Sequence, residues 1–214
     1  TGATISATDT PITINHTGNV TIGAALSSGN GNVDIDATGA GSTVSLNQTV
    51  TTSTGNVTVD SNAGTTIIAA GTITTTTGNV TFGGTLAGTL TTAGNVSTTG
   101  NGGDVTFARA VTLSGNITVN TGAAAGDITF QQTINGTAAE TLTLTAGTGD
   151  VTVSGITGGT SALGSLGITG HIVTLTGIGN AGAGVTGAVN VTSSGAGGYI
   201  DLLGQHYRSG NNQT

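Results

Sequence analysis

The chain has 214 residues and a formal net charge of −7, and it contains 40 Gly, two Tyr, three Phe and no Cys, Met or Trp. Two basic side chains against nine acidic ones argue against nucleic acid and anionic membranes as partners, because both bind clustered Lys or Arg. The lack of Cys excludes disulfides and thiolate metal sites, and no apolar run is long enough to insert into a bilayer.

A five-residue motif, Gly-(Asn/Asp)-(Val/Ile)-Thr-(Ile/Val/Phe), recurs along the chain with small variations. Its third position is Val33, Val57, Val80, Val105, Ile128 and Val151, at spacings of 24, 23, 25, 23 and 23 residues. Repeats of this length are typical of solenoids, in which each repeat buries its apolar face against its neighbours. Val, Ile and Thr favour strands, and Gly, Asn and Asp favour tight corners. The sequence therefore predicts an all-β solenoid with about 23 residues per coil.

Within each motif, apolar and polar residues alternate, so the first and third strand residues face inward together. The third strand residue is Phe in three successive copies, at Phe82, Phe107 and Phe130. We expect these rings to stack one coil apart, at roughly the 4.8 Å spacing of neighbouring strands. The six motif residues and the three Phe form the predicted core column.

Two further sets of apolar residues predict about three short strands per coil. A second column is assigned to Val20, Val44, Ile67 or Ile68, Ile117 and Leu142, and short strands to Leu26, Val50, Ile73, Leu86, Val111 and Ile134. The insert 83–88 predicts a bulge or a change of cross-section. Regular coils run from about 15 to 153 and degenerate coils from 154 to 214, with strands at 170–175, 187–191 and 198–202, all in a single domain 1–214.

The end of the chain shows no capping helix, so we expect it to be part of a longer solenoid or one subunit of a fibre. The runs 76–82 and 198–204 resemble the strand repeats of filamentous haemagglutinin-like secreted bacterial proteins. This resemblance implies a right-handed parallel β-helix that is exported to the bacterial cell surface and serves adhesion or the formation of extracellular fibres.

One corner position carries a column of side chains with oxygen atoms, namely Asn32, Asn56 and Asn79 followed by Asp104, Asp127 and Asp150. The Asn residues predict a corner ladder in which each amide donates to the next side-chain carbonyl. The three Asp would repel one another. We expect each either to cap its own turn amides or to share a bound Ca²⁺, the one cofactor that the sequence suggests.

Other candidate sites lack the partners that catalysis needs. Asp34 and Asp36 share the outer side of one strand, but without the basic and aromatic shell of a glycosidase or lyase. His16, His171 and His206 have no metal-ligand spacing, and no nucleophile elbow is present. We therefore expect a protein that is not an enzyme.

An outward column of Thr58, Thr81, Thr106, Thr129 and Thr152 raises the possibility of ice binding, which requires two parallel Thr columns. Two residues further on, the outward positions are Asp60, Gly83, Ala108, Gln131 and Ser154, so the second column is missing there.

The favoured hypothesis is a structural or adhesive module of a secreted or cell-surface bacterial protein that associates end to end through strand edges. Its expected partners are further copies, neighbouring solenoid segments, or a ligand on a host or neighbouring cell. The alternatives are a passive stalk of a larger adhesin and an ice-binding protein.

Overall fold

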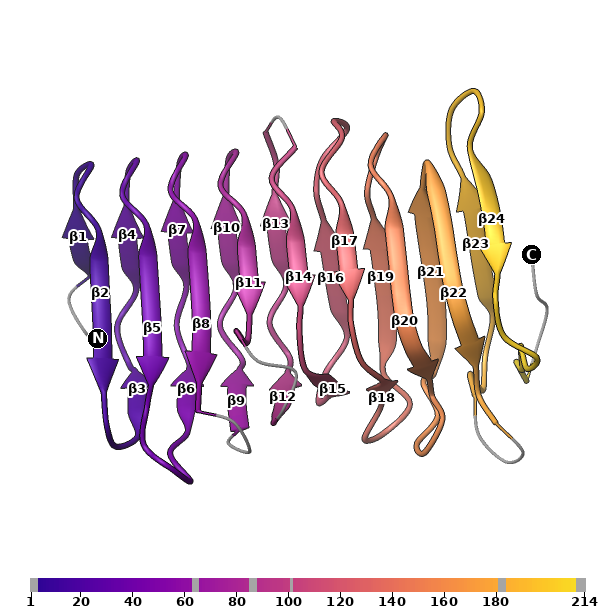
Figure 1. Ribbon diagram of the computed structural model, residues 1–214, viewed down its shortest axis with the longest axis horizontal. Helices are drawn as coiled ribbons and strands as arrows, with labels where there is room; N and C mark the ends of the chain where they lie inside the picture. The colour runs from indigo at the N-terminus through magenta and orange to yellow at the C-terminus, as the bar shows by residue number, and fades with distance from the viewer. Residues whose placement is uncertain (1–3, 63–65, 85–87, 101, 181–183, 211–214) are drawn as a thin grey trace.

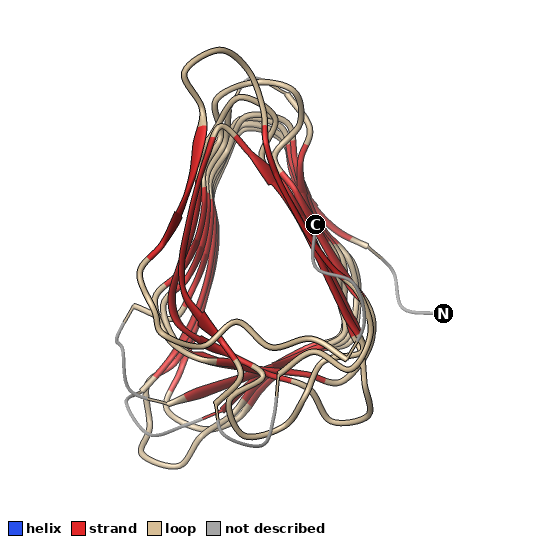
Figure 2. Cartoon of the chain, turned by 90° about the vertical axis from the view of Figure 1, so that its right-hand side faces the viewer, coloured by secondary structure: helices blue, strands red, loops and turns tan. Residues whose placement is uncertain are grey.

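The computed structural model describes residues 4–62, 66–84, 88–100, 102–180 and 184–210. Within these ranges every regular element is a β-strand, and every strand pair is parallel. The coils stack side by side along a rod (Figure 1). Viewed along the rod, the cross-section has three sides (Figure 2). The predicted all-β solenoid of about three short strands per coil is confirmed.

Three faces run the length of the rod, named here A, B and C. Face A consists of β1 (Ile5–Ala7), β4 (Leu26–Ser28), β7 (Val50–Thr52), β10 (Ile73–Thr75), β13 (Val96–Thr98), β16 (Ile117–Asn120), β19 (Thr141–Thr145), β21 (Ser165–Gly170) and β23 (Val189–Ser193). Face B consists of β2 (Ile12–His16), β5 (Val33–Ala37), β8 (Val57–Ser61), β11 (Val80–Phe82), β14 (Val105–Phe107), β17 (Ile128–Phe130), β20 (Val151–Thr157), β22 (Ile172–Ile178) and β24 (Tyr199–Leu202). Face C consists of β3 (Val20–Ile22), β6 (Val44–Leu46), β9 (Thr66–Ala69), β12 (Thr89–Thr92), β15 (Ala110–Leu113) and β18 (Ile134–Asn135).

Two long strands continue the solenoid beyond residue 153. The first part of β20 pairs with β17 on face B, and its last residue, Thr157, pairs with β18 on face C. The pairing of β20 with β22 shifts register between Val153 and Ile156, where the strand turns the corner between the two faces. Parallel pairing then continues through β22 and β24, so the coils of the C-terminal third keep the same architecture.

The core is the interior of this three-sided rod. The predicted column of Val33, Val57, Val80, Val105, Ile128 and Val151 is fully buried and paired in register from coil to coil. The rings of Phe82 and Phe107 stack with centroids 5.2 Å apart, and those of Phe107 and Phe130 with centroids 4.2 Å apart. Because every coil shares its apolar side chains with the next, no coil has a core of its own.

The second predicted column mixes residues of two faces, and this assignment is wrong. Val20 pairs with Val44, and Val44 with Ile67, on face C, but that column continues through Leu90, Val111 and Ile134. Ile117 pairs with Leu142 on face A. The short strands at Leu26, Val50 and Ile73 likewise lie on face A and continue to Val96, whereas Val111 and Ile134 lie on face C; Leu86 falls outside the described residues.

The cause is a change in corner length near the predicted insert. Between faces B and C, β11 ends at Phe82 and β12 begins at Thr89, whereas one coil later β14 ends at Phe107 and β15 begins at Ala110. Longer corners elsewhere in the later coils restore the coil length. The repeat therefore keeps its period of about 23 residues, although residues at the same distance from the motif lie on different faces before and after the insert.

The Gly of each motif permits close contact between coils. A Cβ added to Gly55 would lie 2.0 Å from the carbonyl oxygen of Gly31, and one added to Gly78 would lie 2.0 Å from that of Gly55. The carbonyl oxygens of Gly55 and Gly78 also accept hydrogen bonds of 2.5 Å from the buried hydroxyls of Thr52 and Thr75 in their own coils. Any larger side chain at these corners would push neighbouring coils apart.

We expect Phe107→Ala to lower the free energy of unfolding by about 3–5 kcal/mol, because it leaves a cavity between two rings that cannot collapse around it. Urea denaturation followed by circular dichroism measures the loss. The matched control is Thr106→Ala on the outer side of the same strand, for which a change within about 0.5 kcal/mol is expected. Equal effects of the two substitutions would contradict the shared core.

Candidate functional site

The Asn and Asp corner column forms one continuous hydrogen-bonded ladder. The Oδ1 atom of Asn56 accepts from the backbone N–H of Asn79 at 2.9 Å, and that of Asp104 accepts from the N–H of Asp127 at 2.9 Å. The same bond joins Asn32 to Asn56, Asn79 to Asp104, Asp127 to Asp150, and Asp150 to Ile172, at 2.8–3.0 Å. Each side chain therefore supplies one oxygen to the backbone of the next coil.

This geometry corrects two predictions from the sequence. The Asn amides do not form the expected ladder of side chain to side chain, and the Asp carboxylates do not cap their own turns; both residue types bind the backbone N–H of the following coil. Only the side-chain oxygen that Asn and Asp have in common is used, which explains why either residue can occupy this position. The part of the chain that the structure describes holds no group of three or more His, Cys, Asp or Glu residues suited to a metal ion.

Asp127→Ala should lower the free energy of unfolding by about 1 kcal/mol, because it leaves the N–H of Asp150 without its acceptor. Asp127→Asn keeps the acceptor oxygen and is the matched control, with a change within about 0.5 kcal/mol expected. Thermal unfolding of the three proteins, each with EDTA and with Ca²⁺, measures both effects. A Tm of the unmodified protein that rises with Ca²⁺ but not in Asp127→Ala would show instead that the Asp column binds the ion.

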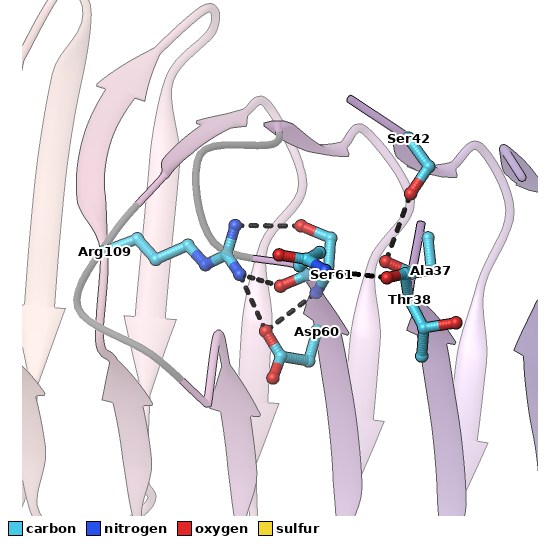
Figure 3. Close-up of polar contacts among 7 residues, drawn as sticks. Ala37, Thr38, Ser42, Asp60, Ser61 and Arg109 are labelled. Carbon is cyan, nitrogen blue, oxygen red and sulfur yellow. Dashed lines mark hydrogen bonds and ion pairs between the residues drawn. The ribbon is translucent and has the colours of Figure 1, made fainter. Parts of the chain in front are cut away.

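Arg109 forms a buried polar cluster with two residues from the end of β8 (Figure 3). Its guanidinium donates from Nη2 to Asp60 Oδ1 at 2.8 Å and from Nη1 to Ser61 Oγ at 2.8 Å, and it also donates to the backbone oxygen of Ser61. The Arg109 side chain is fully buried, while 24% of the Asp60 side chain is exposed. Arg109 therefore connects the corner after β14 to a strand two coils earlier.

The intervening coil makes room for this long reach with a glycine. Gly83 has a positive φ of 82°, and a Cβ there would lie 2.6 Å from Arg109 Nε and 2.7 Å from its Cγ. Only Gly meets both conditions, the left-handed backbone and the close approach. In the sequence, Gly83 lies in an irregular insert and Arg109 has no recognisable partner, because their contact depends on which coils lie next to each other.

A short row of carboxylates lies beside Arg109. Asp36 and Asp60 are register partners on β5 and β8, and Asp34 is on the outer side of β5 as predicted. Burial raises the pKa of Asp36, and repulsion from Asp60 and then Asp34 raises it further, while Arg109 lowers it. The cation thus offsets a row of like charges, and its hydrogen bonds with Asp60 and Ser61 hold the corner where the coil geometry changes.

We expect Asp60→Asn to lower the free energy of unfolding by about 3–5 kcal/mol, because it leaves the buried Arg109 charge without its carboxylate. Asp34→Asn, on the exposed side of the neighbouring coil, removes the same charge and should change stability by less than about 0.5 kcal/mol. Chemical denaturation at neutral pH compares the two. If Asp34→Asn were as harmful as Asp60→Asn, the ion pair would not be the reason.

Three further titratable groups, Glu140, His16 and His171, form hydrogen bonds at corners of the solenoid. Glu140 is buried, and its carboxylate accepts from the N–H groups of Thr137 and Ala138 at 2.8 Å. Burial raises the pKa of Glu140, but the hydrogen bonds from Thr137 and Ala138 outweigh burial and hold the pKa below its ordinary value. His16 Nδ1 accepts from the N–H of Gly18, and His171 Nδ1 pairs with the backbone oxygen of Ser194, so these two histidines serve separate corners.

The Thr column predicted on face B is present. Thr58, Thr81, Thr106, Thr129 and Thr152 are register partners in successive coils, and Thr174 extends the column. The Asn and Asp ladder lies two residues before this column. Of the positions two residues after it that were expected to face outward, Asp60, Gln131 and Ser154 are exposed or partly exposed, whereas Gly83 and Ala108 are buried. Face B therefore carries one Thr column next to the Asn and Asp ladder.

The two ends of the rod expose residues that are buried in the coils between them. On the last coil, Ile200 and Leu202 pair with the buried Val173 and Leu175 but are themselves 41% and 51% exposed. A cavity of about 230 Å³ opens there between side chains of β22, β23 and β24 and Tyr207. On the first coil, Ile5 is 52% exposed. These ends are apolar cross-sections of the core.

Comparison of the chain with protein-family models, with curated proteins and with solved structures finds no match. The described part of the chain also contains no helix that is long and apolar enough to cross a membrane.

Proposed function

We propose that this chain is a non-enzymatic structural module of an extracellular bacterial fibre or surface protein, and that such modules join end to end. The observation that carries the proposal is the pair of exposed apolar ends, where strands have a hydrogen-bonding partner on one side only. In the described residues β1 and β2 pair only with β4 and β5, and β23 and β24 pair only with β21 and β22. The resemblance to filamentous haemagglutinin-like repeats supports the bacterial and extracellular assignment.

The two ends of the rod match each other, because apolar residues of one end would meet apolar residues of the other. If β24 of one copy paired with β2 of the next in the register used inside the rod, Ile200 and Leu202 would stack on Ile12 and Ile14. The outward Asp201 would then lie next to the uncharged Thr13. This arrangement repeats the alternation that every internal face B pair shows. Parallel pairing of this kind adds a strand to each face and leaves the same two ends free.

The joint is head to tail, which favours filaments over closed dimers. A head-to-tail contact uses two different surfaces of each copy, so a third copy can always be added unless the rotation closes a ring. A straight solenoid adds successive copies along its own axis. The cavity between β22, β23 and β24 provides space for aliphatic side chains of the next coil, and burying them removes apolar area from water.

Ile200→Asp should prevent this assembly, because it places a charge in the middle of the proposed joint. We expect the unmodified protein to form rods whose length grows with concentration, as measured by electron microscopy and sedimentation velocity. The control Thr129→Asp introduces the same charge on the side of the rod and should leave assembly intact. Circular dichroism verifies that both variants are folded.

Monomers of the unmodified protein at all concentrations would refute the proposal, and so would equal assembly of the two Asp variants.

A further inference from the structure

Face A carries two parallel columns of hydroxyl and amide side chains, which the sequence did not reveal. The first column lies just before the inward residue of each strand and consists of Thr49, Thr72, Asn95, Thr118, Thr143 and Asn190, with a gap at Gly167, which has no side chain. The second lies just after it and consists of Ser27, Thr51, Thr74, Ser97, Asn120, Thr145, Thr169 and Thr192. The first column also takes part in the backbone ladder, because the carbonyl oxygens of Thr49 and Thr72 accept hydrogen bonds from the N–H groups of Leu26 and Val50. All of these residues are exposed or partly exposed.

The columns form a lattice because the backbone fixes both of its spacings. Residues in one column are one coil apart, roughly 4.8 Å, and the two columns are two residues apart along the strand, roughly 6.6 Å. Both distances approximate repeats between oxygen atoms on the surface of hexagonal ice. Thr is branched at Cβ and has few rotamers, so its hydroxyl and methyl groups are held in place before any ligand arrives.

The hydroxyl groups of this lattice are available to water. In the described residues, the side-chain hydroxyls of Thr49, Thr51, Thr72 and Thr74 make no hydrogen bond to protein, nor do those of Thr118, Thr143, Thr145, Thr169 and Thr192. By contrast, the inward Thr52 and Thr75 of the same strands donate to corner carbonyls. The two columns contain no charged residue, whereas face B has the Asp row beside its single Thr column. A charged side chain would hold its own hydration shell and disturb ordered water.

We infer that face A is an ice-binding surface, on which the two columns hold water in an arrangement that continues into the crystal. Bridging waters hydrogen bond almost as well as a direct contact, and their ordering costs least where the protein groups are already fixed. Face A comes closer than face B to the two parallel Thr columns that ice binding requires, with Thr at four of the seven positions of the first column and at five of the eight positions of the second. This activity is independent of the joint between the ends proposed above.

The test compares two double variants that carry the same substitutions on different faces. Thr74→Tyr with Thr145→Tyr places bulky rings on the second column of face A, and Thr106→Tyr with Thr152→Tyr places them on face B. Tyr has a high strand propensity, so both proteins should fold, which circular dichroism verifies. Thermal hysteresis, inhibition of ice recrystallisation and incorporation into a growing ice hemisphere provide three measurements.

The unmodified protein and the face B variant should shape ice crystals, slow recrystallisation and enter the ice hemisphere, and the face A variant should lose all three effects. An unmodified protein that is excluded from ice would overturn the inference, as would equal behaviour of the two variants. Keeping the protein below the concentration at which rods form separates this outcome from that of the end-to-end joint. Ile200→Asp should retain ice binding while losing assembly.

Discussion

Parallel hydrogen bonding between residues about 23 positions apart is the constraint on which this structure depends. Neighbouring strands must lie close enough to bond, and this fixes what each position of the coil can be. The corner Gly is needed because a Cβ would collide with the carbonyl of the preceding coil. The Asn or Asp after it is needed because its oxygen extends the ladder around the corner. The third and fifth residues of the motif are apolar because they face the shared interior.

A stack of this kind separates the sides of the rod from its ends. Along the sides, each strand is hydrogen-bonded to a strand in both neighbouring coils, so the outer side chains can vary without cost to the core. At the ends, the same core residues that are buried elsewhere meet solvent, as Ile200 and Leu202 show. Association is therefore expected at the ends, and recognition of a periodic ligand is expected along the sides.

Arg109 shows how the stack tolerates an irregularity. The corner between faces B and C shortens just where Arg109 occurs, and its guanidinium reaches past Gly83 to Asp60 and Ser61. This bond spans two coils, which backbone pairing between adjacent coils cannot do. It also places a cation beside Asp36 and Asp60, whose charges would otherwise repel across the register. One ion pair thus joins coils of the longer corner to coils of the shorter one.

The sequence alone determined the period, the alternation and the stacked Phe residues, because these depend only on the distance along the chain between equivalent positions. It also identified the Asn and Asp column, but not the atoms that these side chains bind. Ile117 and Leu142 were assigned to the wrong column because corner lengths change while the period does not. The role of Arg109 and the two polar columns of face A were decided by tertiary structure alone. Both depend on which residues of different coils become neighbours, and that follows from the length of every corner between them.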